Sequence, residues 1–286
     1  MPTLDSTRLI KDLREKTGAG MMDCKRALEE AKSDFNEALV ILRKKGLSDA
    51  AKKSARVTKE GAVVFQVDGK AGAIVEINCE TDFVAKGADF QALAKTVAAK
   101  ASSGALKTLA VANDEFVTPL VGKLGENMGL RRYDRFEMKG AGLIAGYAHQ
   151  TDPSVPAKKG ALIELSVANE AAAKAPELAE LAKELLLQIV GFSPKYLNRE
   201  EIPAADIAKE KEIHAEILRK EGKPEASIPK IIEGKINKLF YQQWVLLDQL
   251  SVRDNKTPVR EILRATGAKL GGEVKVVRFV RYQLGE

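Results

Sequence analysis

Cysteine, histidine and tryptophan are scarce in this chain of 286 residues, and their scarcity argues against several kinds of site. The sequence has two cysteines, two histidines and one tryptophan. Cys24 and Cys79 lie far apart and form neither a CxxC motif nor a metal-ligand spacing, which favours reduced, buried thiols over a disulfide or a zinc site. Neither His149 nor His214 has a serine or cysteine nucleophile at a recognisable motif spacing. We therefore expect no metal and no catalytic residue.

Long apolar runs are also missing. No run approaches the roughly 18 residues that a membrane-spanning helix needs. The first 16 residues lack the apolar centre of a signal peptide. The expectation is a soluble, cytoplasmic protein with no membrane partner. With 45% hydrophobic and 30% charged residues, a chain of this length can bury real cores, and we expect it to divide into more than one domain.

The common phosphate-binding and catalytic motifs are absent. There is no GxGxxG after a predicted strand and no GxxxxGK[ST], so no cofactor is expected. Glu80 and Asp82 form the one suggestive pair of carboxylates, but such a pair can equally cap the next turn. His149 follows a predicted strand and is typical of a structural histidine, whereas His214 lies mid-helix among charges and is predicted to be exposed. These features indicate a protein that is not an enzyme.

Charge does not point clearly to nucleic acid. The formal net charge is +6, from 46 basic and 40 acidic residues, and the two signs are interspersed along predicted helical faces. Cations gather at residues 52–56 and 130–135, but aromatic content is 5% and an RNP-type strand motif is lacking. Nucleic acid is therefore not expected as a direct ligand, and RNA binding is kept as the alternative function.

The first 55 residues show apolar positions at helical spacing in three segments, which predicts a three-helix bundle. Gly18 and Gly20 separate the first helix from the second. The "SDF" at 33–35 offers an N-cap for the third helix, which is predicted to end near Gly46. The lysine-rich stretch 47–59 then predicts a separate, solvated connecting helix.

From Gly61 the apolar period changes from helical to alternating. The order strand, hairpin, strand, helix occurs at residues 62–101 and again at 142–190, which predicts a duplicated α+β core with antiparallel sheets. Between the copies, residues 116–138 predict a helix that enters another strand. The alternation at 273–284 predicts a final strand that returns to one of the sheets.

A helical hairpin is predicted between residues 207 and 250. Ile213, Ile217 and Leu218 define the apolar face of its first helix. A stripe on its second helix contains Ile228, Ile231, Ile232, Ile236, Leu239 and Phe240. Such an arm can serve as an interaction surface or simply pack within the chain, and both alternatives remain open. The predicted domains are 1–55 (helical), 56–140 (first core repeat with linker helix), 141–200 (second core repeat), 201–255 (inserted helical hairpin) and 256–286 (return to the core).

Phe83 raises a particular question because it occurs where the chain should turn, in "INCETDFVAKGADF" at 77–90. If it lies on a loop that leaves the strand, it can fold inward and cover Phe90 or Leu93. A protruding Phe83 would instead anchor in the pocket of a partner protein. Composition alone does not separate these alternatives.

Two long segments of the sequence carry a family resemblance. "LREKTGAGMMDCKRALEEA" at 13–31 and "EINCETDFVAK" at 76–86 closely resemble bacterial elongation factor Ts, the guanine-nucleotide exchange factor of the GTPase elongation factor Tu, and "LGENMGLRR" at 124–132 is a third similar segment. The resemblance extends over essentially the whole chain. It implies a small ubiquitin-associated-like helical domain, a duplicated α+β core and a helical hairpin, the layout predicted above.

The resemblance also implies a partner and a set of contact residues. Elongation factor Tu would be the partner, and Thr81, Asp82, Phe83 and Val84 would contact its GTPase domain and disturb its Mg²⁺ site. Further contacts with that partner are implied for Arg14, Met21, Met22, Lys25 and His149. Met suits an adaptable contact, although Met22 can also be an ordinary core residue.

The second copy lacks this segment. Where the first has "CETDFVA", the second has "VANEAAA", so we expect only the first copy to act on Mg²⁺. The alternative to an exchange factor is an RNA-binding, translation-associated protein. The sequence does not determine the oligomeric state and leaves a homodimer open.

Overall fold

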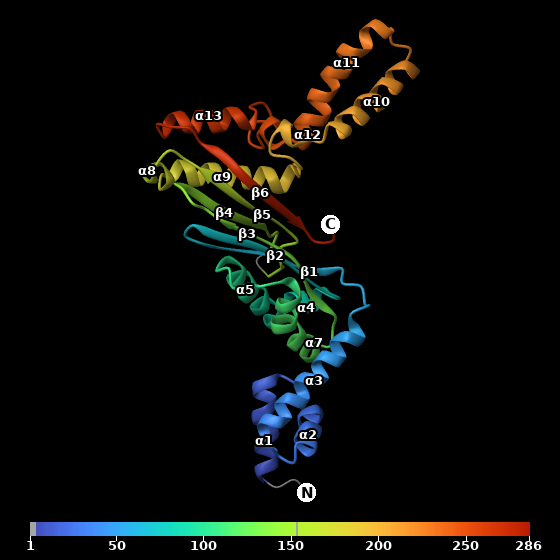
Figure 1. Ribbon diagram of the computed structural model, residues 1–286, viewed down its shortest axis with the longest axis vertical. Coiled ribbons are helices and arrows are strands. Elements are labelled where there is room, and N and C mark those ends of the chain that lie inside the picture. Colours follow the sequence, from blue (N-terminus) through green and yellow to red (C-terminus); the bar gives the residue numbers. More distant parts are fainter. Residues whose placement is uncertain (1–3, 153) are drawn as a thin grey trace.

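The computed structural model describes residues 4–152 and 154–286. Residues 1–3 of the predicted N-terminal domain lie outside the described range. The molecule is elongated, with a helical unit at one end, two β-sheets in the middle and a helical hairpin at the other end (Figure 1). The predicted α+β class, with N-terminal helices and two antiparallel sheets, is confirmed. The predicted domain boundaries remain predictions.

The N-terminal unit contains α1 (Leu4–Thr17), α2 (Met21–Glu30) and α3 (Phe35–Lys53). Its core consists of small and aliphatic side chains: Leu13, Cys24, Ala27, Leu28, Ala31, Ala38 and Leu42. Asp34 caps α3, because its carboxylate accepts a hydrogen bond from the backbone N–H of Glu37 at 2.8 Å. This is the N-cap geometry that leaves few helix donors unpaired.

The predicted end of the third helix near Gly46 is wrong, and so is the separate connecting helix. Helix α3 continues through Gly46 to Lys53. A glycine inside a helix costs only about 1 kcal/mol relative to alanine, and the residues after it are good helix formers. Helix α7 (Thr118–Leu124) passes beside this point of α3: a Cβ on Gly122 would lie 3.7 Å from the Gly46 Cα, an ordinary contact distance, and a Cβ on Gly46 would meet no atom within 4 Å. The two helices therefore approach closely at this pair.

Each half of the core is a three-stranded antiparallel sheet. The first contains β1 (Glu60–Asp68), β2 (Ala71–Cys79) and β3 (Met128–Glu137), with β2 in the centre. The second contains β4 (Gly142–His149), β5 (Lys159–Ser166) and β6 (Lys275–Gln283), with β5 in the centre. The predicted return of the last strand to a sheet is confirmed, because β6 pairs with β5.

Helices cover one face of each sheet. On the first sheet, Val75 and Ile77 of β2 pack against Phe90 of α5 (Ala88–Ser102), in a core that also includes Val121 of α7. Short helical turns complete this layer: α4 (Asp82–Lys86), α6 (Leu109–Ala112) and a π-helical turn at Asn113–Val117.

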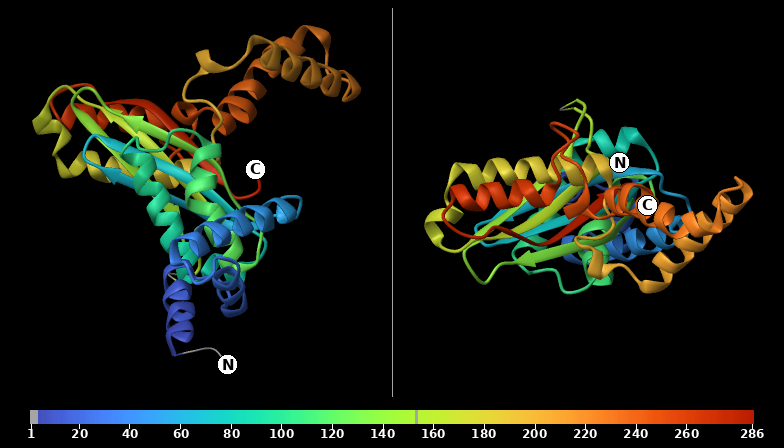
Figure 2. Two further views of the ribbon diagram at one scale, coloured as in Figure 1. Left: turned by 60° about the horizontal axis from the view of Figure 1, so that its bottom comes forward. Right: turned by 90° about the horizontal axis from the view of Figure 1, so that it is seen from above.

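On the second sheet the covering helices are α9 (Pro176–Phe192) and α13 (Val259–Lys269), preceded by the short α8 (Glu170–Ala173). Figure 2 shows α9 and α13 lying along this sheet.

The two remaining sheet faces pack against each other (Figure 1). The apolar residues between them are Val63, Ile74, Phe136, Met138, Ile144, Leu162 and Tyr282. Alternation along β2 thus sends Val75 and Ile77 toward α5 and Ile74 toward the other sheet. The central strands are buried on both faces for this reason.

The helical hairpin projects away from the sheets (Figures 1 and 2). Its elements are α10 (Ala204–Lys220), α11 (Ile228–Lys235), a π-helical segment at Ile236–Tyr241 and α12 (Gln242–Trp244). Leu218, Ile228, Ile232 and Ile236 form its small core. Within the described residues, no helix combines the length and the apolarity needed to span a membrane.

Three predictions about the hairpin faces are wrong. Ile213 and Ile217 are exposed, and the residues of α10 that are buried are His214 and Leu218. Residues at i and i+4 share a helix face, so His214 and Leu218 lie together on the buried face of α10. Ile213 and Ile217 form a second such pair, which lies on a neighbouring face that is exposed. Leu239 is also exposed, because the wider π-helical turn shifts the apolar stripe of the second helix.

His214, predicted to be exposed, is therefore buried, and its Nε2 lies 3.3 Å from Glu210 Oε1.

Both cysteines are free and buried, as predicted. Burial raises the pKa of Cys24, and it raises the pKa of Cys79 to about 12. Since the thiolate is the reactive form, we expect neither thiol to react quickly with Ellman's reagent at pH 8 in the native protein, and two equivalents to react in denaturant. Fast reaction of one equivalent under native conditions would contradict this burial.

Candidate functional site

The segment around Phe83 is a one-turn helix and not a loop. Helix α4 begins directly after β2, with Thr81 as its N-cap. The Thr81 hydroxyl accepts a hydrogen bond from the backbone N–H of Val84 at 3.3 Å. The residue that caps this turn is therefore Thr81, and not Glu80 or Asp82, for which the sequence allowed a capping role.

Helix α4 directs Phe83 outward. The Phe83 side chain is 83% exposed, whereas Ala85 is buried and Val84 packs partly against the core of the first sheet. The inward alternative, with Phe83 covering Phe90 or Leu93, does not occur. Single exposed apolar residues are ordinary, but an almost fully exposed phenylalanine on a helix that is anchored by its neighbours is a candidate anchor for another protein.

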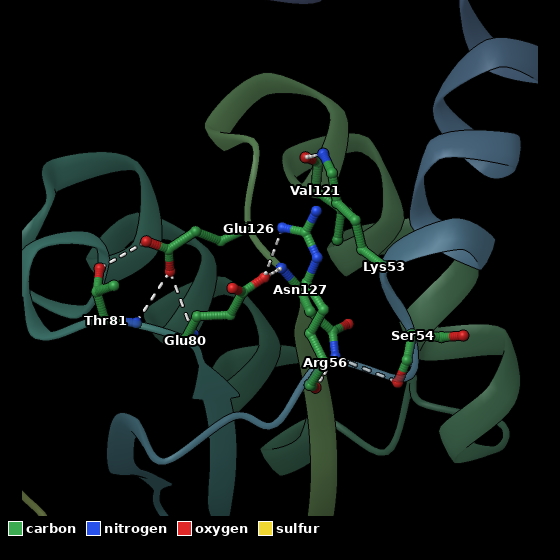
Figure 3. A network of polar contacts seen from close by, with 8 residues as sticks. All are labelled: Lys53, Ser54, Arg56, Glu80, Thr81, Val121, Glu126 and Asn127. Carbon is green, nitrogen blue, oxygen red and sulfur yellow. Dashed lines mark hydrogen bonds and ion pairs between the residues drawn. The ribbon is translucent and has the colours of Figure 1, made fainter.

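A carboxylate from a distant part of the chain holds the start of α4. Glu126, in the loop between α7 and β3, accepts hydrogen bonds from the backbone N–H of Glu80 at 3.2 Å and of Thr81 at 3.0 Å through one oxygen. Its other oxygen accepts from the Thr81 hydroxyl at 2.6 Å (Figure 3). The carboxylate is therefore shared among three donors at this turn, and charged acceptors make stronger hydrogen bonds than neutral ones.

The neighbouring residues connect this turn to the end of α3. The Glu80 carboxylate accepts a hydrogen bond from the Asn127 backbone N–H at 2.6 Å and lies 3.4 Å from Arg56 Nη1. The Asn127 N–H, followed by the Arg56 charge, lowers the pKa of Glu80 below its ordinary range. The Asn127 amide donates to the carbonyls of Ser54 at 3.3 Å and Arg56 at 2.7 Å (Figure 3). The linker after α3 is thus tied to the same loop.

Asp82, beside Phe83, is paired within its own helix. Its carboxylate accepts a hydrogen bond from Lys86 Nζ at 2.7 Å, and this bond lowers the pKa of Asp82. Asp82 is therefore ionised at neutral pH and lies next to the exposed ring. A partner that binds Phe83 would meet the Asp82–Lys86 ion pair beside the ring.

The other predicted contact residues lie elsewhere. Met21 and Met22, at the start of α2, are 59% and 61% exposed. Met22 is therefore not a core residue. Arg14 on α1 and Lys25 on α2 are exposed as well. The exposed His149 ends β4 in the second sheet, where its Nδ1 lies 2.9 Å from the Tyr147 hydroxyl. The predicted residues thus belong to three separate parts of the fold.

Glu126 and Asn127 lie in the segment "LGENMGLRR", but nothing in the sequence pattern directly indicates a role for either residue. Both act on residues more than 40 positions away. No local spacing predicts such pairs. The sequence holds one indirect signal for these two residues, because both are polar and follow Gly125. Gly125 ends α7 in a left-handed conformation with a φ of 79°. Polar side chains at such turns often form hydrogen bonds with backbone groups.

The second repeat has the same turn without the aromatic ring. Asn169 is the N-cap of α8, and its side chain accepts a hydrogen bond from the Ala172 N–H at 2.9 Å. Two positions after the cap, where α4 has Phe83, α8 has the exposed Ala171. Among the residues that the structure describes, no group of three or more His, Cys, Asp or Glu side chains is placed to hold a metal ion.

Comparison with known proteins agrees with the resemblance noted in the sequence. The family model described as "Elongation factor TS" matches residues 80–286. The elongation factor Ts of a Nitratiruptor species is 40% identical over 292 residues, which cover 98% of this chain and 93% of that protein. That of Prosthecochloris aestuarii is 39% identical over 295 residues, covering 98% of each chain. This chain belongs to the elongation factor Ts family.

Proposed function

We propose that this chain is a guanine-nucleotide exchange factor that binds the GDP form of elongation factor Tu and accelerates GDP release in the cytoplasm. The observation that carries the proposal is Phe83: its ring is 83% exposed, and the helix that bears it is anchored by Glu126 and by the N-cap Thr81. An exposed ring on an anchored turn can enter a partner without first reorganising.

The proposed mechanism acts on the Mg²⁺ and phosphate site of the partner. Mg²⁺ demands nearly ideal octahedral geometry at about 2.0–2.1 Å, so a small displacement of the elements that hold it weakens its grip on the nucleotide phosphates. Phe83 would insert as the wedge, with Thr81, Asp82 and Val84 making contacts beside it. The ionised Asp82 would add a charge that competes for cations and polar groups near that site.

Binding energy and exchange are linked by reciprocity. If the factor lowers the affinity of the partner for GDP by some ratio, then GDP must lower the affinity of the partner for the factor by the same ratio. Rebinding of nucleotide therefore displaces the factor. Burying one phenylalanine contributes about 1.5–3 kcal/mol, which corresponds to about one to two decades in an equilibrium. The rest of the tenfold changes in affinity would come from contacts at Arg14, Met21, Met22 and Lys25 in the N-terminal unit and at His149.

The test is release of a fluorescent GDP analogue from purified elongation factor Tu, followed by stopped flow with excess unlabelled GDP. We expect the rate to rise with added protein and one molecule of the factor to serve many molecules of the partner. No acceleration would refute the proposal. Turnover of GTP by this chain alone would instead indicate an enzyme.

The alternative, an RNA-binding translation-associated protein, is tested in the same preparation. It predicts binding to RNA that weakens steeply as salt increases, since each neutralised phosphate releases counterions. We expect no such binding, because the charges are interspersed and the exposed candidate residue is an isolated phenylalanine.

A further inference from the structure

We propose that Glu126 is a positioning residue for nucleotide exchange: its carboxylate holds the start of α4 and thereby the direction of Phe83. This inference rests on the exchange function proposed above. Three hydrogen bonds support it, from the N–H groups of Glu80 and Thr81 and from the Thr81 hydroxyl. Figure 3 shows the Glu126 carboxylate directed at this turn.

Helix α4 needs such a support because it is short. Its five residues are far fewer than the roughly 12 that an isolated helix requires. In a common N-terminal arrangement, a Glu or Gln at the third helical position accepts a hydrogen bond from the N–H of the cap residue. That position is Val84 in α4, and its side chain packs against the core. Glu126 supplies the missing acceptor from 45 residues away.

The second repeat provides an internal comparison. In "LGENMGLRR" at 124–132 and "LGGEVKVVR" at 270–278, the leading Leu-Gly and the final Arg coincide. Gly125 and Gly271 both have positive φ, 79° and 71°. In this correspondence Gly272 takes the place of Glu126, just as Ala171 takes the place of Phe83. The remote carboxylate and the exposed ring thus occur together in one copy and are both missing from the other.

The experiment measures GDP-analogue release from elongation factor Tu with wild type, Glu126→Ala and Glu126→Gln. We expect Glu126→Ala to slow factor-stimulated release about five- to thirtyfold, the range that corresponds to one or two kcal/mol. Glu126→Gln should keep most of the activity, because an amide oxygen still accepts the two N–H bonds and the amide nitrogen can donate to the Thr81 hydroxyl.

Asn113→Ala is the matched control. Asn113 likewise makes three hydrogen bonds, in its case all to backbone groups: it donates to the carbonyls of Leu109 and Leu130 and accepts from the Leu130 N–H. It lies on the π-helical turn and makes none of the bonds at Thr81. We expect its substitution to lower thermal stability about as much as Glu126→Ala while leaving exchange close to wild type.

A double-mutant cycle with Phe83→Ala separates positioning from a direct contact. If Glu126 acts through Phe83, Glu126→Ala should cause little further loss when the ring is already absent. An additive loss, an unaffected Glu126→Ala, or an equal loss in Asn113→Ala would each overturn the inference. The wild-type protein in the same series tests the proposed function separately. If wild type accelerates release, the function stands whatever the Glu126 variants show, whereas an inactive wild type would refute the function itself.

Discussion

Phe83→Ala is expected to reduce factor-stimulated GDP release from elongation factor Tu about tenfold or more, the size that corresponds to burying one phenylalanine in a partner. The free protein should lose almost no stability, because the side chain is 83% exposed and its removal leaves no cavity. The measurement is stopped-flow release of a fluorescent GDP analogue, with circular dichroism to compare the folded state of the variant with that of wild type.

Two control variants make this prediction specific. Phe192→Ala removes another exposed phenylalanine, at the end of α9, and should leave the rate unchanged. Ala171→Ser changes the corresponding position of the second repeat and should also have little effect. Equal losses in Phe83→Ala and Ala171→Ser would contradict the asymmetry between the repeats. Full activity of Phe83→Ala would transfer the mechanism to Asp82 and to the N-terminal helices.

The strands and the duplication were predictable because alternating burial leaves a direct mark on the sequence. In β2, every second residue faces α5 and the intervening Ile74 faces the other sheet. Both faces of β2 are apolar, so its apolar residues form a continuous run, and the change of period at Gly61 marks the start of the preceding strand, β1. Helix α3 was harder to predict, because Gly46 is a helix-ending signal in the sequence, yet its cost of about 1 kcal/mol is outweighed by the good helix formers around it and the helix continues to Lys53.

The direction of Phe83 was not predictable from local pattern. A phenylalanine shortly before Phe90 can face inward or outward, and its direction depends on Val84 and Ala85, which occupy the inner face of α4. Glu126 was missed for a related reason, since its hydrogen bonds join residues that approach each other only after β2 and β3 pair. The prediction of an exposed His214 is wrong because the charged neighbours of a residue do not determine which side of a helical hairpin is covered.

Both central strands carry a buried glutamate that is paired with an arginine of the neighbouring strand. Glu76 on β2 and Glu164 on β5 each lie beside a β-bulge. Arg132 Nε lies 2.7 Å from Glu76 Oε2, and Arg278 Nε lies 2.7 Å from Glu164 Oε2. Each guanidinium also stacks on an aromatic ring of the opposite sheet at 4.2 Å, Arg132 on Tyr282 and Arg278 on Phe136.

The two glutamates differ in their further partners. Arg131 lies 3.2 Å from Glu76 as a second cation, whereas the described residues give Glu164 the single ion partner Arg278. Removing one partner of a buried pair costs about 3–5 kcal/mol because the remaining charge is uncompensated. Arg278 is partly exposed, so water can reach the site and reduce the cost.

Arg278→Ala is therefore expected to lower the free energy of unfolding by about 2–3 kcal/mol, and Arg132→Ala by about half as much, because Arg131 remains beside Glu76. Urea unfolding, with hydrogen exchange of the β5 amides to locate the effect, measures both. Arg264→Ala removes an exposed cation paired with Glu261 and should change stability by less than about 1 kcal/mol. If all three variants changed stability equally, the buried glutamates would contribute nothing beyond surface charge, and the two sheets would be held together by their apolar faces alone.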